Sequence, residues 1–324
     1  MYFFNAVDRG NLGNVETDGM SKDLGFVGEQ FSLLILLFYV PNGLCDLPLN
    51  LLTKRFSGRV MLPALMVGWG AMALLQAAVK NFGGMLAIRL LLGAFEAGFF
   101  GGAVFYLTLF YTRDELGFRI ALFFGSALLA SAFSGLISFG VFQIHHPKVT
   151  GWMWLFLIEG AMTVIFGVIA FWWLPASPQT AWFLTEDQRR VATLRSLQDG
   201  SGKINEEFNL RQCFKSWNSW RFLVCMSENS RAATTGLLVG LGNIGGILSA
   251  STFRTTYTPR YAPTLIATAA CNVTCIFFTL GLGLWMRKQN NRKNQEQGVV
   301  LRAEDVDTNE LRDGEDDPRW RYFV

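Results

Sequence analysis

Along this chain, apolar residues form long runs that alternate with shorter polar segments. A helix needs about 20 mainly apolar residues to cross a bilayer. Runs of roughly that length cover 30–52, 60–79, 84–110, 119–143, 152–174, 232–252 and 262–286. A more polar segment, from Met1 to about Met20, precedes them. The pattern therefore predicts an all-α polytopic membrane protein of about eight spans, six in the first part of the chain and two in the last.

The first segment differs from the later spans because Asp8 and Arg9 lie inside it. The residues that precede Asp8 would form only about 10 Å of helix. Either this span is short at its cytoplasmic end, or the natural N-terminus lies upstream of Met1. The segment lacks the positively charged start, apolar core and cleavage site of a secretory signal, so we expect no signal peptide.

Polar composition divides the chain into four parts. Residues 1–175 are predicted to form an N-terminal six-helix bundle, and residues 176–230 a cytoplasmic linker rich in Arg and Lys. Within the linker, the sequence that follows Thr185 is typical of a capped amphipathic helix. Residues 231–286 carry the last two spans, and the polar tail 287–324 is predicted to be disordered for much of its length.

Positive residues are concentrated in alternate loops, which sets the expected orientation. Lys54, Arg55 and Arg59 follow the second span, and Arg113 and Arg119 flank the start of the fifth. The loops between them carry few positive residues. By the positive-inside rule, these two loops, both ends of the chain and the linker are cytoplasmic.

Composition agrees with a membrane location and argues against an enzyme. Of the 324 residues, 51% are hydrophobic and only 16% are charged, and the aromatic residues include 29 Phe and 10 Trp. The five Cys have neither disulfide nor zinc spacing,. The chain also lacks a Walker sequence, a nucleophile elbow and a zinc-protease motif, so we expect no catalytic residues and no metal site.

The fourth apolar run contains two charged residues that share one helix face. Arg89 and Glu96 are two turns apart, about 10 Å along the axis,. A charge at the bilayer centre costs about 2.5–3.5 kcal/mol on insertion scales, so such residues usually face a partner or a wet cavity. Two interpretations stay open: an Arg–Glu pair that only orients helices, or a polar path through the membrane.

A weak internal repeat suggests that part of a second half is absent. The fifth span opens at Arg119 and carries Ser134-Gly-Leu-Ile-Ser138, and the seventh opens at Arg231 and carries the similar Gly245-Gly-Ile-Leu-Ser249. Repeated halves are typical of secondary transporters. If the last two spans correspond to the fifth and sixth, four spans are missing, with the join near residues 225–230.

The chain resembles the fungal allantoate permease group, the anion:cation symporter branch of the major facilitator superfamily. The segments that carry the resemblance are 5–14, 46–50, 89–98, 106–113, 151–160, 174–178, 242–246, 257–261 and 321–322. The chain departs from the family pattern at Asp46, where Glu is usual, and at Gly101, where Pro is usual. Family members have about twelve spans, so the resemblance implies a major facilitator-type helix bundle that lacks spans seven to ten.

The resemblance implies a site. Related proton-coupled carriers of organic anions use an Asp-Arg pair in the first span and an Arg and a Glu in the fourth, which correspond here to Asp8, Arg9, Arg89 and Glu96. A guanidinium binds a carboxylate through a planar fork, and a carboxyl group in a partly dry cavity can carry a proton. Asp8 and Glu96 are therefore the predicted proton-coupling residues, and Arg9 and Arg89 the predicted substrate-binding residues.

Of the two arginines, we expect Arg9 to make the main substrate contact, because Glu96 is the expected partner of Arg89. Asn11, Asn14 and Tyr106 are predicted to add neutral hydrogen bonds to the substrate. The alternative for the two asparagines is hydrogen bonding between helices.

The resemblance implies a proton-coupled symporter of small organic anions, such as allantoate, nicotinate or other vitamin-like carboxylates. We expect it to lie in the plasma membrane of a fungus and to use the proton gradient rather than a cofactor. The expected partners are a small carboxylate and the lipid bilayer, not nucleic acid, and no oligomeric state is predicted. The alternative is a truncated membrane protein that does not transport, or an incomplete gene model of such a carrier.

Overall fold

The computed structural model describes residues 1–198 except 112, 145 and 148, together with residues 239, 262–302, 306 and 318–322. Within these ranges the chain is helical, with one isolated bridge between His146 and Val149 in place of any strand. All but one residue of the predicted seventh span, 232–252, and the predicted join near residues 225–230 lie outside the described residues.

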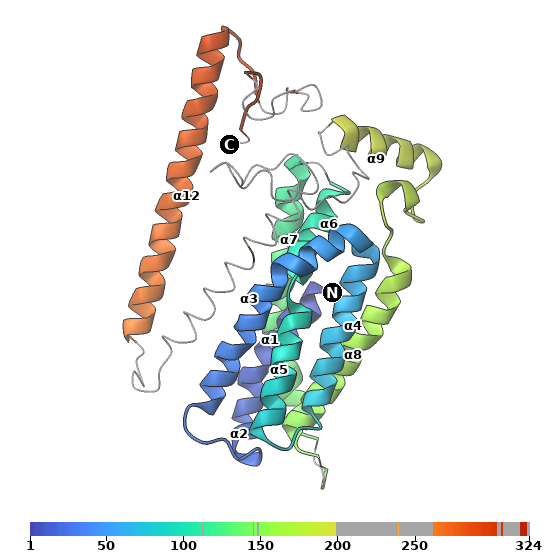
Figure 1. The fold of residues 1–324 in the computed structure, drawn as a ribbon, viewed down its shortest axis with the longest axis vertical. Helices are drawn as coiled ribbons and strands as arrows, with labels where there is room; N and C mark the ends of the chain where they lie inside the picture. The colour runs from blue at the N-terminus through green and yellow to red at the C-terminus, as the bar shows by residue number, and fades with distance from the viewer. Residues whose placement is uncertain are drawn as a thin grey trace.

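The predicted spans of the first part are helices that pack side by side in one bundle (Figure 1). They are α1 (Tyr2–Thr17), α3 (Gln30–Phe56), α4 (Gly58–Gln76), α5 (Phe82–Glu96) with α6 (Phe99–Thr108), α7 (Arg113–Phe142) and α8 (Gly151–Trp173), and the short α2 (Met20–Asp23) follows α1. Among the described residues, six segments are long and apolar enough to cross a membrane. Helix α1, with 16 residues, is not one of them.

Glycines let α4 and α8, the most extensively packed pair, approach closely. A Cβ atom built on Gly160 of α8 would lie 2.7 Å from the backbone nitrogen of Leu74, and one built on Gly70 of α4 would lie 3.1 Å from the backbone nitrogen of Val164. Small residues at such positions bring helix backbones together and exclude other groups from between them. The interface of α4 and α8 is therefore closely packed.

The fourth span is interrupted, although its apolar run predicts one continuous helix. Helix α5 ends at Glu96 and α6 begins at Phe99. Between them Gly98 has φ = 71°, a conformation that glycine adopts without strain,. A Cβ atom on Gly98 would also lie 2.5 Å from the Cβ of Leu49, so the position requires glycine for space. The interruption gives the span an internal helix end at Glu96.

The capped helix predicted after Thr185 is confirmed as α9 (Glu186–Gln198), which follows a short 3₁₀ turn at Pro178–Thr180. The backbone N–H of Thr185 donates to the Gln188 side chain at 3.0 Å, and the Gln188 N–H donates back to the Thr185 hydroxyl at 3.4 Å. This reciprocal pair satisfies two donors that an isolated helix start would leave unpaired.

Helix α12 (Ala262–Gln297) extends beyond the predicted span 262–286 into the polar tail. It stands apart from the bundle (Figure 1), and none of its most apolar stretch is buried by the described parts of the chain. Residues 318–322 of the tail lie against the C-terminal end of α12. There the buried guanidinium of Arg321 donates to Asn294 at 2.7 Å and to Gln297 at 2.9 Å. The prediction of disorder is therefore wrong for residues 287–297 and 318–322.

The distribution of Lys and Arg predicts that the linker faces the cytoplasm. In a variant whose native cysteines are replaced by serine, Lys203→Cys should react with an impermeant maleimide only after intact cells are permeabilised. The matched control is Lys80→Cys, an exposed position in the opposite set of loops, which should react without permeabilisation. Labelling of the Lys203 position in intact cells would reverse the orientation.

Candidate functional site

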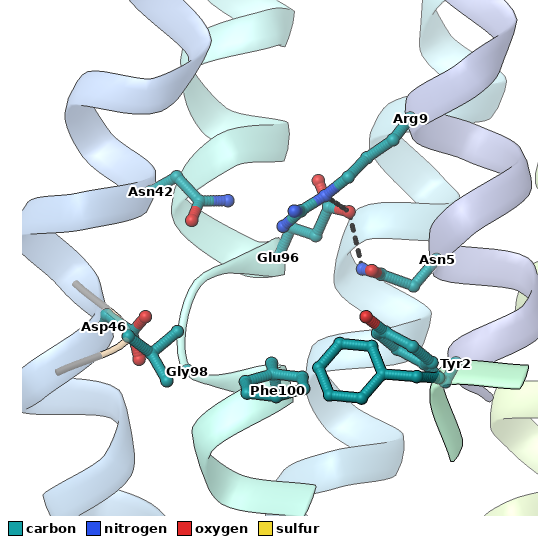
Figure 2. A pocket seen from close by; sticks show the side chains of 10 residues that line it. Tyr2, Asn5, Arg9, Asn42, Asp46, Glu96, Gly98 and Phe100 are labelled. Carbon is teal, nitrogen blue, oxygen red and sulfur yellow. Dashed lines mark hydrogen bonds and ion pairs between the residues drawn. The ribbon is translucent and has the colours of Figure 1, made fainter. Parts of the chain in front are cut away.

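A pocket of about 390 Å³ opens where α1, α3 and the interruption between α5 and α6 meet (Figure 2). The residues that line it are Tyr2, Asn5, Arg9, Asn42, Asp46, Glu96, Gly98, Phe100, Phe124 and Val239. Figure 2 shows Asn5 and Arg9 from α1 facing Asn42 and Asp46 from α3, with Glu96 between them. Two predicted site residues, Arg9 and Glu96, therefore belong to one pocket.

The centre of the pocket is an ion pair between two helices. The Arg9 Nε donates to the Glu96 Oε1 at 2.6 Å, and the Asn5 side-chain amide donates to the same oxygen at 2.5 Å. The Glu96 side chain is 1% exposed, whereas that of Arg9 is 37% exposed. Because only Nε of Arg9 is engaged among the described residues, its terminal nitrogens can receive a second carboxylate.

A second carboxylate of the pocket, that of Asp46, lies at the start of α6. The backbone N–H of Gly98 donates to it, and so does the Asn50 side chain at 2.6 Å. Because a helix N-terminus carries partial positive charge, this carboxylate stabilises the internal helix start. The Asp46 side chain therefore fixes one wall of the pocket, opposite the guanidinium of Arg9.

Asp8 neighbours Arg9 in sequence but points away from the pocket, into the interior of the bundle. Its Oδ2 accepts from the Trp69 indole N–H at 3.1 Å and from the Thr163 hydroxyl at 3.4 Å. The residue is 7% exposed. The two predicted proton-coupling carboxyls, Asp8 and Glu96, thus lie in different environments, one between α1, α4 and α8 and the other in the pocket.

The predicted partnership of Arg89 with Glu96 is wrong, because Glu96 pairs with Arg9 across the helix interface. Arg89 is 3% exposed, and its Nε and Nη2 have no hydrogen-bond partner among the described residues. Its guanidinium lies over the Phe156 ring, 5.8 Å from the centroid, a favourable cation–π arrangement,. Arg89 does not line the pocket.

The structure does not bring Asn11 and Asn14 to the pocket either. The Asn14 amide donates to the Ser134 hydroxyl at 2.9 Å, and that hydroxyl donates to the Asn11 side-chain oxygen at 3.0 Å. These bonds join α1 to α7, so the observed contacts are those of the alternative interpretation, hydrogen bonding between helices.

Tyr106 lies at the far end of α6, away from the pocket. Its hydroxyl donates to the backbone oxygen of Pro175 at 2.6 Å, which ties α6 to the segment that follows α8. We expect Tyr106→Phe to lower the free energy of unfolding by about 1 kcal/mol, the usual value of one hydrogen bond. Thermal unfolding in detergent measures the loss. An unchanged affinity for a bound carboxylate is expected alongside it, and a tenfold weaker affinity would return Tyr106 to the site.

Among the pocket residues that sequence reasoning missed are three polar ones on α1 and α3: Asn5, Asn42 and Asp46. A signal for them was present, because residues four apart share a helix face. Asn5 precedes Arg9 by four positions, and Asn42 precedes Asp46 by four in an otherwise apolar span. Stripes of polar residues inside spans mark the faces that meet in the pocket.

Comparison with known proteins gives a consistent picture. A family model described as Major Facilitator Superfamily matches residues 1–295. The major facilitator-type transporter hxnP of Emericella nidulans is 43% identical, with 100% of this chain and 90% of that protein covered. The MFS-type transporter efuF of Hormonema carpetanum is 36% identical, with 99% and 88% covered.

A similar solved structure is that of a bacterial homologue of the human lysosomal transporter Spinster, in an inward-facing and occupied conformation. It is 18% identical, with a TM-score of 0.48, and the match covers 80% of this chain and 60% of that one.

The alignment with hxnP extends over 444 positions, whereas this chain has 324 residues. The relative therefore contains residues that have no counterpart here, which agrees with the prediction of missing spans.

Proposed function

Because this chain belongs to the major facilitator superfamily and is an integral membrane transporter of that type, we propose that it imports small organic anions together with protons. The proposed substrates are allantoate, nicotinate or other vitamin-like carboxylates, as in the fungal allantoate permease group that the sequence resembles. The proposed location is the plasma membrane of a fungal cell, with the proton gradient as the driving force.

The observation that carries this proposal is the Arg9–Glu96 pair in the pocket. A carboxylate that enters the pocket meets a guanidinium whose terminal nitrogens are open to it, because Glu96 occupies Nε alone. Bidentate binding to these nitrogens would be strong and specific for a planar anion. The pocket volume of about 390 Å³ lies within the range typical of small-molecule sites,.

The same pair offers a way to couple substrate to proton. A substrate carboxylate and the Glu96 carboxylate compete for one guanidinium. The Arg9–Glu96 ion pair therefore becomes weaker when the substrate binds. A proton on Glu96 removes the competition and leaves Arg9 to the substrate. Binding of the anion and binding of the proton would then favour each other, which is the reciprocal linkage that symport requires.

The alternative, a membrane protein that does not transport, has one observation in its favour. Alternating access in this superfamily uses two bundles that move around a site between them. The described residues contain one bundle and a separate helix, α12. A binding measurement on this chain, followed by transport, separates the two functions.

Binding is tested by thermal unfolding of the purified chain with nicotinate and with nicotinamide, its uncharged amide. A ligand at about one hundred times its Kd stabilises the folded state by about 2.7 kcal/mol. We expect nicotinate or allantoate to raise the Tm and nicotinamide to leave it unchanged. Equal stabilisation by acid and amide, or none by any small carboxylate, would contradict the proposal.

A further inference from the structure

Glu159 is a buried acidic residue of α8 for which the proposed mechanism gives no role. It is 5% exposed, and neither of its carboxyl oxygens has a hydrogen-bond partner among the described residues. It does not line the pocket. A carboxylate with a purely structural role would be expected to accept hydrogen bonds where it lies.

Helix α8 packs against α4, α1 and α7, and these helices supply few charges near Glu159. From α1, Asp8 is the charged residue that acts on it electrostatically. On α4 the one ionisable residue is Arg59, at the cytoplasmic end, and on α7 the ionisable residues all fall within the first turns, from Arg113 to Arg119. Two cations lie further along the packed helices: Arg9 of α1 is paired with Glu96, and Arg89 lies over Phe156 of α8 without an ion pair to Glu159. Among the described residues, no cation therefore pairs with Glu159.

A hydrogen bond from Thr163 of α8 connects the helix that carries Glu159 to Asp8 of α1. Thr163, which donates to the Asp8 carboxylate at 3.4 Å, follows Glu159 by four positions. That spacing places the two residues on one helix face, about 6 Å apart along the axis. Asp8, Thr163 and Glu159 thus form a buried polar row between α1, α4 and α8, separate from the Arg9–Glu96 pair.

An ionised Glu159 would be very costly at this position. The effective free-energy cost of burying an unpaired ion is several kcal/mol. The cost of burying a neutral carboxylic acid is much smaller. Next to it, Gly160 meets the α4 backbone so closely that even a Cβ atom would clash. The protonated form avoids the penalty without any partner cation.

The count of charges in the bundle leads to the same conclusion. Its buried carboxyl groups are on Asp8, Asp46, Glu96 and Glu159, and among the described residues the guanidinium groups away from the ends of its helices are on Arg9 and Arg89. With all of them ionised, carboxylates outnumber guanidiniums, which a low-dielectric interior disfavours. A proton on Glu159 reduces this excess, and among the described residues Glu159 is the one of these four carboxyl groups with neither hydrogen bond nor ion pair.

We propose that Glu159 is a proton-binding site inside the bundle, occupied in this conformation and separate from the pocket, and that it exchanges its proton with Asp8 during transport. In the exchange the O–H bond of the Glu159 acid breaks and an O–H bond forms on the Asp8 carboxylate. The Thr163 hydroxyl already donates to Asp8, and when Glu159 also reaches it, it can pass the proton by accepting one from Glu159 and donating its own to Asp8. The occupied site stands independently, whereas the exchange rests on the proposed proton-coupled function.

The test of the occupied site is infrared spectroscopy of the purified chain in lipid nanodiscs at neutral pH. A protonated carboxylic acid gives a carbonyl-stretch band, separate from the amide bands, that shifts in D₂O. We expect this band in the wild type and its loss in Glu159→Gln, with Glu115→Gln as the control. Glu115 is a half-exposed carboxylate paired with Arg195 at 2.7 Å, and its removal should leave the band unchanged.

A measurement on the wild type alone guards against misfolding of the variant. Labelling glutamate with ¹³C at the side-chain carboxyl should shift the band, whereas the same label in aspartate should not. Absence of the band at neutral pH, a shift with aspartate label only, or an undiminished band in folded Glu159→Gln would each overturn the occupied site.

The exchange is tested by uptake of radiolabelled nicotinate into proteoliposomes that carry an inward proton gradient. We expect Glu159→Gln to bind nicotinate as the wild type does and to lose at least tenfold in gradient-driven accumulation. Undiminished accumulation by this variant would overturn the exchange. If the wild type itself does not accumulate nicotinate, the proposed function fails for that anion, and the infrared band still decides whether the site holds a proton.

Discussion

Arg9→Lys is expected to weaken binding of the substrate carboxylate by at least about tenfold, which corresponds to roughly 1.4 kcal/mol. Lysine keeps the positive charge and can still reach Glu96, but it lacks the planar fork that holds two carboxylates at once. In the structure the Arg9 Nε donates to Glu96 at 2.6 Å. The substrate carboxylate must therefore bind the terminal nitrogens of Arg9, which lysine does not have. Equilibrium binding of a radiolabelled carboxylate measures the loss.

The matched control is Arg89→Lys, in the same bundle but outside the pocket. Because Arg89 is buried over Phe156, its replacement should lower expression or turnover while substrate affinity stays within about twofold, roughly 0.4 kcal/mol,. The assignment of Arg9 would be wrong if the wild type and Arg9→Lys bound the same anion equally well.

Glu96→Gln is expected to abolish proton-driven accumulation and to leave exchange of substrate across the membrane. Glutamine has nearly the size of the acid and can still bind the Arg9 side chain through its amide oxygen, but it takes up no proton at accessible pH. The variant resembles the protonated state of Glu96, in which Arg9 is open to the substrate. Counterflow and gradient-driven uptake, measured on the same proteoliposomes, separate exchange from accumulation.

Glu115→Gln is again the control, because this carboxylate lies near the start of α7 and outside the pocket. It should leave both activities unchanged. If Glu96→Gln kept the pH dependence of uptake seen in the wild type, Glu96 would have a structural role only.

Much of the fold could be predicted from sequence because bilayer-spanning helices need long apolar runs. The runs at 30–52 and 60–79 correspond to α3 and α4, and the cap at Thr185 marks the start of α9. The interruption at Gly98 could not be found in this way. Apolar residues continue on both sides of it, and the need for glycine arises from the approach of Leu49 on another helix.

Ion-pair partners were less predictable than charged positions. Helical spacing relates residues of one helix, so it identified Arg89 and Glu96 as residues of one face. It does not show which neighbouring helix meets that face. The end of α5 meets α1, and the partner of Glu96 is therefore Arg9, whereas Arg89 packs against Phe156.

The central claim, import of an organic anion driven by protons, is tested most directly by accumulation in proteoliposomes. The purified chain is reconstituted, an inward proton gradient is imposed, and uptake of radiolabelled nicotinate and allantoate is followed with and without a protonophore. We predict that one of these carboxylates rises above its external concentration and returns to equilibrium when the protonophore collapses the gradient. Uptake that reaches the same level with and without the gradient, or no uptake of either anion, would contradict the account.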